Sequence, residues 1–172
     1  MPIDPQDLLD LAKRQVGLEK GAPEADLRRG ISTAYYALFH FLIKEALANF
    51  VSDVAFRTKV GRAFQHGAMR SVCDKYNPKP DKKTGELIAP EGHGFPSQVI
   101  APDVRTVAAT FLALQQARET ADYDDAATVQ HAEALIAVQQ VDQAFQAWLR
   151  LQTEPSAATF LQELLYRSII KR

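Results

Sequence analysis

The sequence predicts an all-α protein, a helical bundle of five to six helices with one long Pro/Gly-rich loop near residues 77–102. Three observations predict it. Apolar residues recur at helical spacing along most of the chain, no segment alternates as a half-buried strand does, and prolines and glycines concentrate in that one stretch. The chain of 172 residues is long enough for one domain, 1–172, with a substantial core.

The central helix, about 23–50, has apolar residues on nearly all sides, and such a helix belongs inside a bundle. A polar line crosses it. At 100° per residue, Arg29, Tyr36 and His40 lie within about 40° of one another. Buried polar groups are costly unless they are paired. This line is therefore a hydrogen-bonded network, an interface or a site.

The other helices follow from start and stop signals. Asp4–Pro5 begins a first helix that ends near Gly17, because Asp is a good N-cap and Pro suits the first helical position. Ser52–Asp53 caps a third helix, which His66–Gly67 can interrupt before Tyr76. Helices over 102–121 and 128–151 come next, and an extra C-terminal helix covers about 155–170. Between them, five prolines and three glycines exclude a regular helix over most of 77–102, and a loop of this length is usually a functional lid or a disordered segment.

Composition bounds the class of protein. The formal net charge of −1 argues against wholesale binding to nucleic acid or a membrane. The single cysteine, Cys73, excludes a disulfide framework and a Cys-based zinc site, and fits a reducing compartment. The N-terminus has no basic start followed by an apolar run. We expect a cytoplasmic protein with no membrane partner, no cofactor and no metal site.

Charge is unevenly distributed along the chain. Residues 57–83 hold eight Lys and Arg against two acids, a net of +6, and residues 119–149 hold six acids and no Lys or Arg, a net of −6. One interpretation is two solvated faces, or faces that attract each other within the fold. The other is a phosphate-facing patch around 57–83, in which Arg62 and Arg70 would bind a nucleotide or an RNA backbone.

Three short motifs occur in a fixed order. They are Arg29-x-x-Ser32-x-x-Tyr35-Tyr36-Ala37-x-Phe39-His40, then His66-Gly67-Ala68-Met69-Arg70, then Arg118-x-x-x-Asp122-Tyr123-Asp124. This succession resembles the HEPN domains, a helical nucleotide-binding and RNase-like family of prokaryotes, and it covers roughly Leu8 to Phe145. The resemblance implies a helical bundle, commonly a homodimer. It also implies RNA cleavage, nucleotide binding, or partnership with a nucleotidyltransferase-type antitoxin in toxin–antitoxin and defence systems.

The chain departs from the catalytic pattern of that family. RNase members carry an Arg followed, after four to six intervening residues, by a His. The nearest pair here is Arg62 and His66, with three residues between them. If this pair shares a helical face, it is a degenerate dyad in which Arg stabilises phosphorane charge and His acts as acid or base. Otherwise His66 is a helix-end residue that bonds a carbonyl group.

Each remaining candidate has a functional and a structural interpretation. Arg29 can clamp a phosphate while Tyr36 and His40 supply hydrogen bonds or proton transfer, or the three can form a buried packing network. Arg118 and Asp122, four residues apart, can simply pair.

Alternatively, Arg118 faces the central helix and Asp122 orients His40 or Arg29. Tyr123 would then cap the bundle with its ring buried.

The sequence thus favours a HEPN-like protein that binds RNA, a nucleotide or a partner and lacks the standard RNase motif. A divergent metal-independent endoribonuclease that uses Arg29, His40 or His66 together with Arg118 is one alternative, and a non-catalytic structural adaptor is the other.

Overall fold

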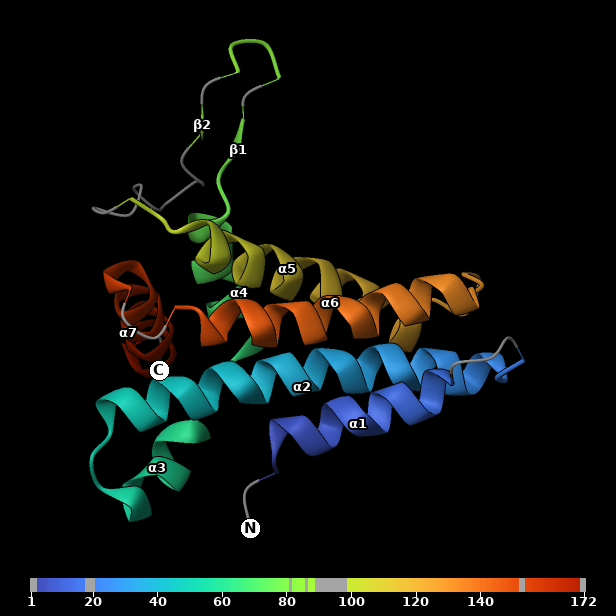
Figure 1. The fold of residues 1–172 in the computed structure, drawn as a ribbon, viewed down its shortest axis with the longest axis horizontal. Coiled ribbons are helices and arrows are strands. Elements are labelled where there is room, and N and C mark those ends of the chain that lie inside the picture. Colours follow the sequence, from blue (N-terminus) through green and yellow to red (C-terminus); the bar gives the residue numbers. More distant parts are fainter. Residues whose placement is uncertain are drawn as a thin grey trace. The chain divides into compact units, whose positions relative to one another are not determined.

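A computed structural model describes residues 3–17, 21–80, 82–85, 87–88, 99–151 and 154–170. Within these ranges the chain forms seven helices (Figure 1). They are α1 (Pro5–Val16), α2 (Glu24–Phe50), α3 (Val54–Gly61), α4 (His66–Tyr76), α5 (Pro102–Tyr123), α6 (His131–Leu149) and α7 (Pro155–Ile170). The predicted all-α fold is confirmed. The described residues form seven helices where five to six were predicted, because residues 62–65 leave helical geometry and separate α3 from α4.

Capping residues set the helix starts that the sequence predicts. Asp4 accepts a hydrogen bond from the backbone N–H of Gln6 at 2.9 Å, and Pro5 is the first residue of α1. Asp53 accepts from the backbone N–H of Ala55 at 2.8 Å at the start of α3. At the other end of α1, Gly17 has φ 70°, a conformation that favours glycine.

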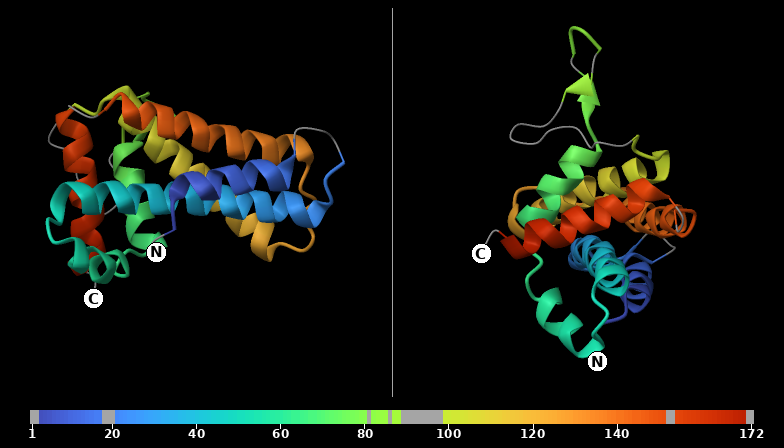
Figure 2. Two further views of the ribbon diagram at one scale, coloured as in Figure 1. Left: turned by 60° about the horizontal axis from the view of Figure 1, so that its bottom comes forward. Right: turned by 90° about the vertical axis from the view of Figure 1, so that its left-hand side faces the viewer.

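The chain divides into two compact units. The first combines residues 1–42 with residues 110–146. In it, α1 runs along the N-terminal part of α2, as Figures 1 and 2 show. The two helices approach closely at Gly30, where an added Cβ would lie 2.6 Å from Val16 Cγ2. Large buried side chains of this unit are Leu9, Val16, Tyr35, Leu38, Leu42, Phe111 and Leu114.

The second unit combines residues 43–109 with residues 147–172. Here α4 packs against α7 (Figure 2), and the rings of Tyr76 and Phe160 have centroids 4.9 Å apart. Glu163 of α7 accepts hydrogen bonds from Lys75 Nζ at 2.7 Å and from the Tyr76 hydroxyl at 3.1 Å. Trp148 Nε1 donates to Glu45 Oε2 at 3.0 Å. This unit therefore has its own aromatic core with a polar clamp at its edge.

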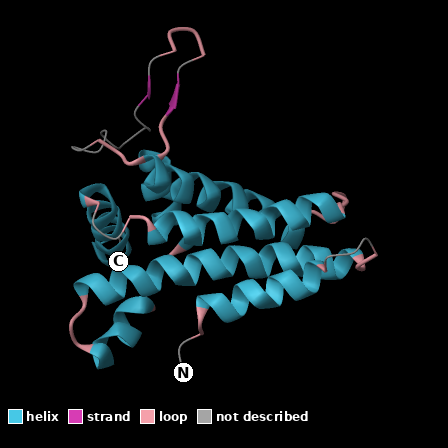
Figure 3. Cartoon of the chain, viewed as in Figure 1, coloured by secondary structure: helices cyan, strands magenta, loops and turns pink. Residues whose placement is uncertain are grey.

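A short antiparallel ladder lies in the predicted loop (Figure 3). Its strands are β1 (Lys79–Pro80) and β2 (Leu87–Ile88), with Lys79 opposite Ile88. No strand was predicted here, because two residues per strand are too few to show alternation. Residues 81, 86 and 89–98 of the loop lie outside the described ranges. None of the helices in the described ranges is long and apolar enough to cross a membrane.

Candidate functional site

A polar network joins the end of α5 to α2 in the first unit. Arg118 Nε donates to Asp122 Oδ2 at 2.8 Å, and Arg118 Nη2 donates to the Tyr123 hydroxyl at 3.1 Å. The other carboxylate oxygen of Asp122 accepts a hydrogen bond from the Ser32 hydroxyl of α2. Asp122 is therefore shared between an ion pair within α5 and a contact between helices. Both sequence interpretations of Arg118 hold in part, since it pairs with Asp122 and also faces the central helix.

The Arg118 guanidinium lies among three tyrosine rings. Its Cζ is 5.8 Å from the ring centroid of Tyr35, 5.7 Å from that of Tyr36 and 5.4 Å from that of Tyr123. These distances are those of cation–π contacts. Burial lowers the pKa of Arg118, but the nearby Tyr36, Asp122 and Tyr123 side chains raise it by more. The pKa of Arg118 therefore lies above its ordinary value. The side chain, 14% exposed, is a permanent cation at the protein surface.

His40 lies against the same tyrosine as Arg118. Its imidazole stacks on the Tyr36 ring with centroids 6.3 Å apart and an interplanar angle of 29°, and the Phe39 ring meets it edge-on at 5.4 Å. Burial lowers the pKa of His40, so its neutral form predominates at pH 7. Its ring nitrogens form no hydrogen bond with the part of the chain that the structure describes. We call Tyr36, His40, Arg118 and Tyr123 the aromatic site.

Three expectations about this region were wrong. Asp122 orients neither His40 nor Arg29, because Ser32 and Arg118 occupy its two carboxylate oxygens. Tyr123 does not cap the bundle with a buried ring: it is the last residue of α5 and is 72% exposed. Arg29 is exposed on the first turns of α2, so it does not belong to a buried packing network. Its side chain makes no ion pair or hydrogen bond with the described residues.

The neighbouring Arg28, which sequence reasoning passed over, holds the α5–α6 connection on α2. Its guanidinium donates to the backbone carbonyls of Ala121 at 2.9 Å and Asp124 at 3.1 Å, and also to that of Ala127. Glu24 Oε1 accepts from Arg28 Nε at 3.0 Å and from the Val129 N–H at 3.2 Å. This clamp fixes the C-terminus of α5, and with it the position of the aromatic site. Its only sequence signal is the Glu24–Arg28 spacing of four.

The remaining predicted residues lie in the second unit. Arg62 follows the end of α3 as an exposed C-cap, whereas His66 is the first residue of α4. The two therefore do not share one helical face, and the proposed dyad loses its geometric basis. Arg70 Nε is 4.0 Å from Asp74 Oδ2, a weak surface pair. Cys73 is fully buried, and burial raises the pKa of its thiol, which makes it inert.

The described residues contain no group of three or more metal-ligating side chains.

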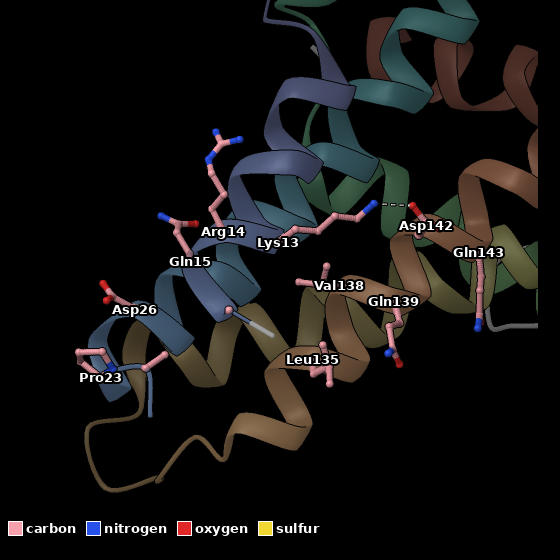
Figure 4. A pocket seen from close by; sticks show the side chains of 12 residues that line it. Lys13, Arg14, Gln15, Pro23, Asp26, Leu135, Val138, Gln139, Asp142 and Gln143 are labelled. Carbon is pink, nitrogen blue, oxygen red and sulfur yellow. Dashed lines mark hydrogen bonds and ion pairs between the residues drawn. The ribbon is translucent and has the colours of Figure 1, made fainter. Parts of the chain in front are cut away.

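A second feature of the described residues lies away from the aromatic site. An open groove of about 1190 Å³ lies between α1 and α6 in the first unit (Figure 4), where Lys13 Nζ pairs with Asp142 at 2.8 Å. Leu135 and Val138 contribute its apolar lining, and no residue of the aromatic site lines it. The groove and the aromatic site are thus separate features.

No family model matches the chain, and no match was found among curated proteins or among solved structures.

Proposed function

We propose that this is a HEPN-like protein of the cytoplasm that binds a nucleotide or single-stranded RNA at the aromatic site. The observation that carries the proposal is the position of Tyr36. Its half-buried ring lies against a cation, Arg118, and against a neutral imidazole, His40. A partly exposed ring held by such neighbours is a stacking surface for a nucleobase. Tyr123, 72% exposed on the adjoining helix end, adds a second ring.

Arg29 supplies the phosphate contact in this proposal. It lies two helical turns before Tyr36 on the same face of α2, and its exposed guanidinium is unpaired among the described residues. A guanidinium binds phosphate in a bidentate manner. Arg118, by contrast, is committed to Asp122 and Tyr123, so its role is to position the rings.

The charge of the first unit sets the expected mode of binding. Residues 1–42 and 110–146 hold six Lys and Arg and twelve Asp and Glu, a net of −6. Such a unit repels a polyphosphate chain. Binding at the aromatic site should therefore come mainly from base stacking and should depend little on salt.

Titration of purified protein with each of the four nucleoside monophosphates tests the proposal, with isothermal calorimetry as the readout. We expect wild type to bind at least one of them. Tyr36→Ala should reduce the affinity about tenfold, a typical loss for removal of one stacking ring. Tyr166→Ala is the matched control, because Tyr166 is an exposed tyrosine of α7 in the second unit. Equal losses in both variants, or no binding by wild type, would refute the proposal.

A second candidate function is metal-independent RNA cleavage. The observation that favours it is that a neutral imidazole, His40, and a permanent cation, Arg118, lie against one ring. His40 would take the 2′-hydroxyl proton, the 2′-oxygen would attack the phosphorus and displace the 5′-oxygen, and that leaving oxygen would take a proton from water. Arg118 would stabilise the phosphorane charge. This function is supported if wild type cleaves RNA in the presence of EDTA and the folded variants His40→Ala and Arg118→Lys do not. No binding and no cleavage, with variants that only melt earlier, supports the structural adaptor instead.

The proposal extends to partners on the strength of the resemblance alone. We propose that two copies associate as a homodimer and that a nucleotidyltransferase-type antitoxin is the cellular partner. Sedimentation equilibrium tests the first statement, since a homodimer has twice the 19.1 kDa mass of the chain. A neighbouring nucleotidyltransferase gene whose product co-purifies with this chain tests the second.

A further inference from the structure

Helix α3 is fixed in place without being buried. None of its eight residues is buried, and Val54 and Phe56 are 70% and 51% exposed. The Asp53 cap and Arg57, whose Nε donates to the Val51 carbonyl at 2.8 Å, hold its start, and at its end Gly61 lies against Leu47 of α2. Helices of this length gain most of their stability from packing an apolar face. An ordered helix with exposed apolar side chains therefore indicates a binding surface.

Two cations continue this surface. Lys59 and Arg62 are exposed and make no ion pair or hydrogen bond with the described residues. Phe56, Lys59 and Arg62 follow one another at a spacing of three, which makes each a neighbour of the next along the helix surface. No acid occurs from Val54 to Arg62. We call Phe56, Lys59 and Arg62 the α3 surface.

The surrounding unit has the opposite charge to the unit with the aromatic site. Residues 43–109 and 147–172 hold fourteen Lys and Arg and nine Asp and Glu, a net of +5. The α3 surface thus presents unpaired cations within a cationic unit, which complements a polyanion.

We infer that the α3 surface binds single-stranded nucleic acid, with a base stacked on Phe56 and phosphates on Lys59 and Arg62. An aromatic ring beside unpaired cations is the combination that binds single strands without sequence preference. A protein partner fits less well, because lysine is depleted in protein interfaces and Lys59 stands between the other two residues. The inference rests on the proposed function for the identity of the polymer as RNA, but the surface belongs to the other unit.

The inference is tested by fluorescence anisotropy with a labelled oligouridylate. A length of about 12 nucleotides lies within the range that single-strand-binding folds cover. The test variant carries Phe56→Ser, Lys59→Glu and Arg62→Glu. The control carries Lys79→Glu and Lys82→Glu, two exposed lysines of the β1–β2 hairpin with the same change in charge. In Figures 1 and 2 the hairpin and α3 lie on opposite sides of α4. Because all these side chains are exposed, thermal melts should match wild type.

We expect the test variant to lose at least about tenfold in affinity and the control to lose much less. Loss of two phosphate contacts should make the plot of log affinity against log salt shallower by about 1.4. Mononucleotide binding by the test variant should equal that of wild type. If the test variant loses oligonucleotide binding and keeps mononucleotide binding, the α3 surface is supported. This conclusion does not depend on the affinity of Tyr36→Ala for mononucleotides.

Three results would overturn the inference. The first is wild-type affinity in the test variant. The second is an equal loss in the hairpin control, which would mean that net charge alone matters. The third is displacement of the oligonucleotide by polyglutamate at an equal concentration of charge, which would identify an acidic protein as the partner. Failure of mononucleotide titrations alone would refute the proposed function and leave the α3 surface standing.

Discussion

The close approach of α1 to α2 predicts a large effect from a small substitution, Gly30→Ala. Gly30 is buried in α2, and a Cβ added there would lie 2.6 Å from Val16 Cγ2. Real Cβ atoms do not tolerate such a distance, so one of the two groups must move. Val16 is 1% exposed, and its β-branched side chain has few alternative rotamers in a helix. The strain must therefore pass to the α1–α2 backbone contact.

The expected magnitude follows from two opposing effects. Overpacking of a well-packed core by one methyl group costs about 1–3 kcal/mol. Replacement of a helical glycine by alanine returns about 0.5–1 kcal/mol through the lower entropy of the unfolded chain. The middle of each range leaves a net destabilisation of about 1 kcal/mol, which for a chain of this size lowers the melting temperature by about 2–4 °C.

Two comparisons make the Gly30→Ala measurement decisive. Gly67→Ala is the matched control, because a Cβ at Gly67 in α4 has no atom within 4 Å, and this variant should be as stable as wild type or more so. Adding Val16→Ala to Gly30→Ala should recover part of the loss, since it removes the atom that clashes. Thermal melts by circular dichroism suffice. A Gly30→Ala variant as stable as wild type would show that α1 does not pack as described.

Three other predictions concern single side chains. Arg118→Lys should cost about 1–2 kcal/mol in urea unfolding, because lysine cannot donate to Asp122 and Tyr123 at once. Hydrogen bonds from the Val129 N–H and then Arg28 hold the pKa of Glu24 below its ordinary value of 4.5. Ionised Glu24 therefore stabilises the folded protein above pH 4.5, and this stabilisation is lost as the pH falls through the lowered pKa. In Glu24→Gln the free energy of unfolding should therefore depend less on pH in that range. Cys73 should react with a thiol reagent only as fast as the protein unfolds, and rapid labelling of the folded protein would contradict its burial.

Local signals in the sequence were enough to predict most of the fold. The Asp4–Pro5 start, the Gly17 end and the Asp53 cap each act within a few residues, so the sequence contains the whole interaction. The break at residues 62–65 lies just before His66–Gly67, where the sequence allows an interruption, but neither a proline nor a strong cap fixes its position and Gln65 makes no side-chain cap. The start of α6 at His131 instead of Thr128 has a distant cause. There the Val129 N–H bonds Glu24, far away in sequence.

The aromatic site was predictable in its members but not in its geometry. Tyr36, His40 and Arg118 were all named from their motifs, and the structure brings them together around one ring. The sequence does not indicate whether Arg28 or Arg29 contacts the α5–α6 connection. Both residues lie on the first turns of α2, and their roles depend on where the α5–α6 connection passes. Periodicity describes the faces of one helix and says nothing about which face a loop will cover.

The distribution of charge between the units has a consequence for any nucleic-acid ligand. The unit with the aromatic site has a net charge of −6, and the unit with the α3 surface has +5. A chain of many phosphates is attracted only by the second, whereas a base can stack at either and Arg29 of the first unit contacts a single phosphate. Affinity for a mononucleotide should therefore be nearly independent of salt, and affinity for an oligonucleotide should fall steeply with it. If both depend on salt equally, the two units do not divide the recognition of bases and phosphates in this way.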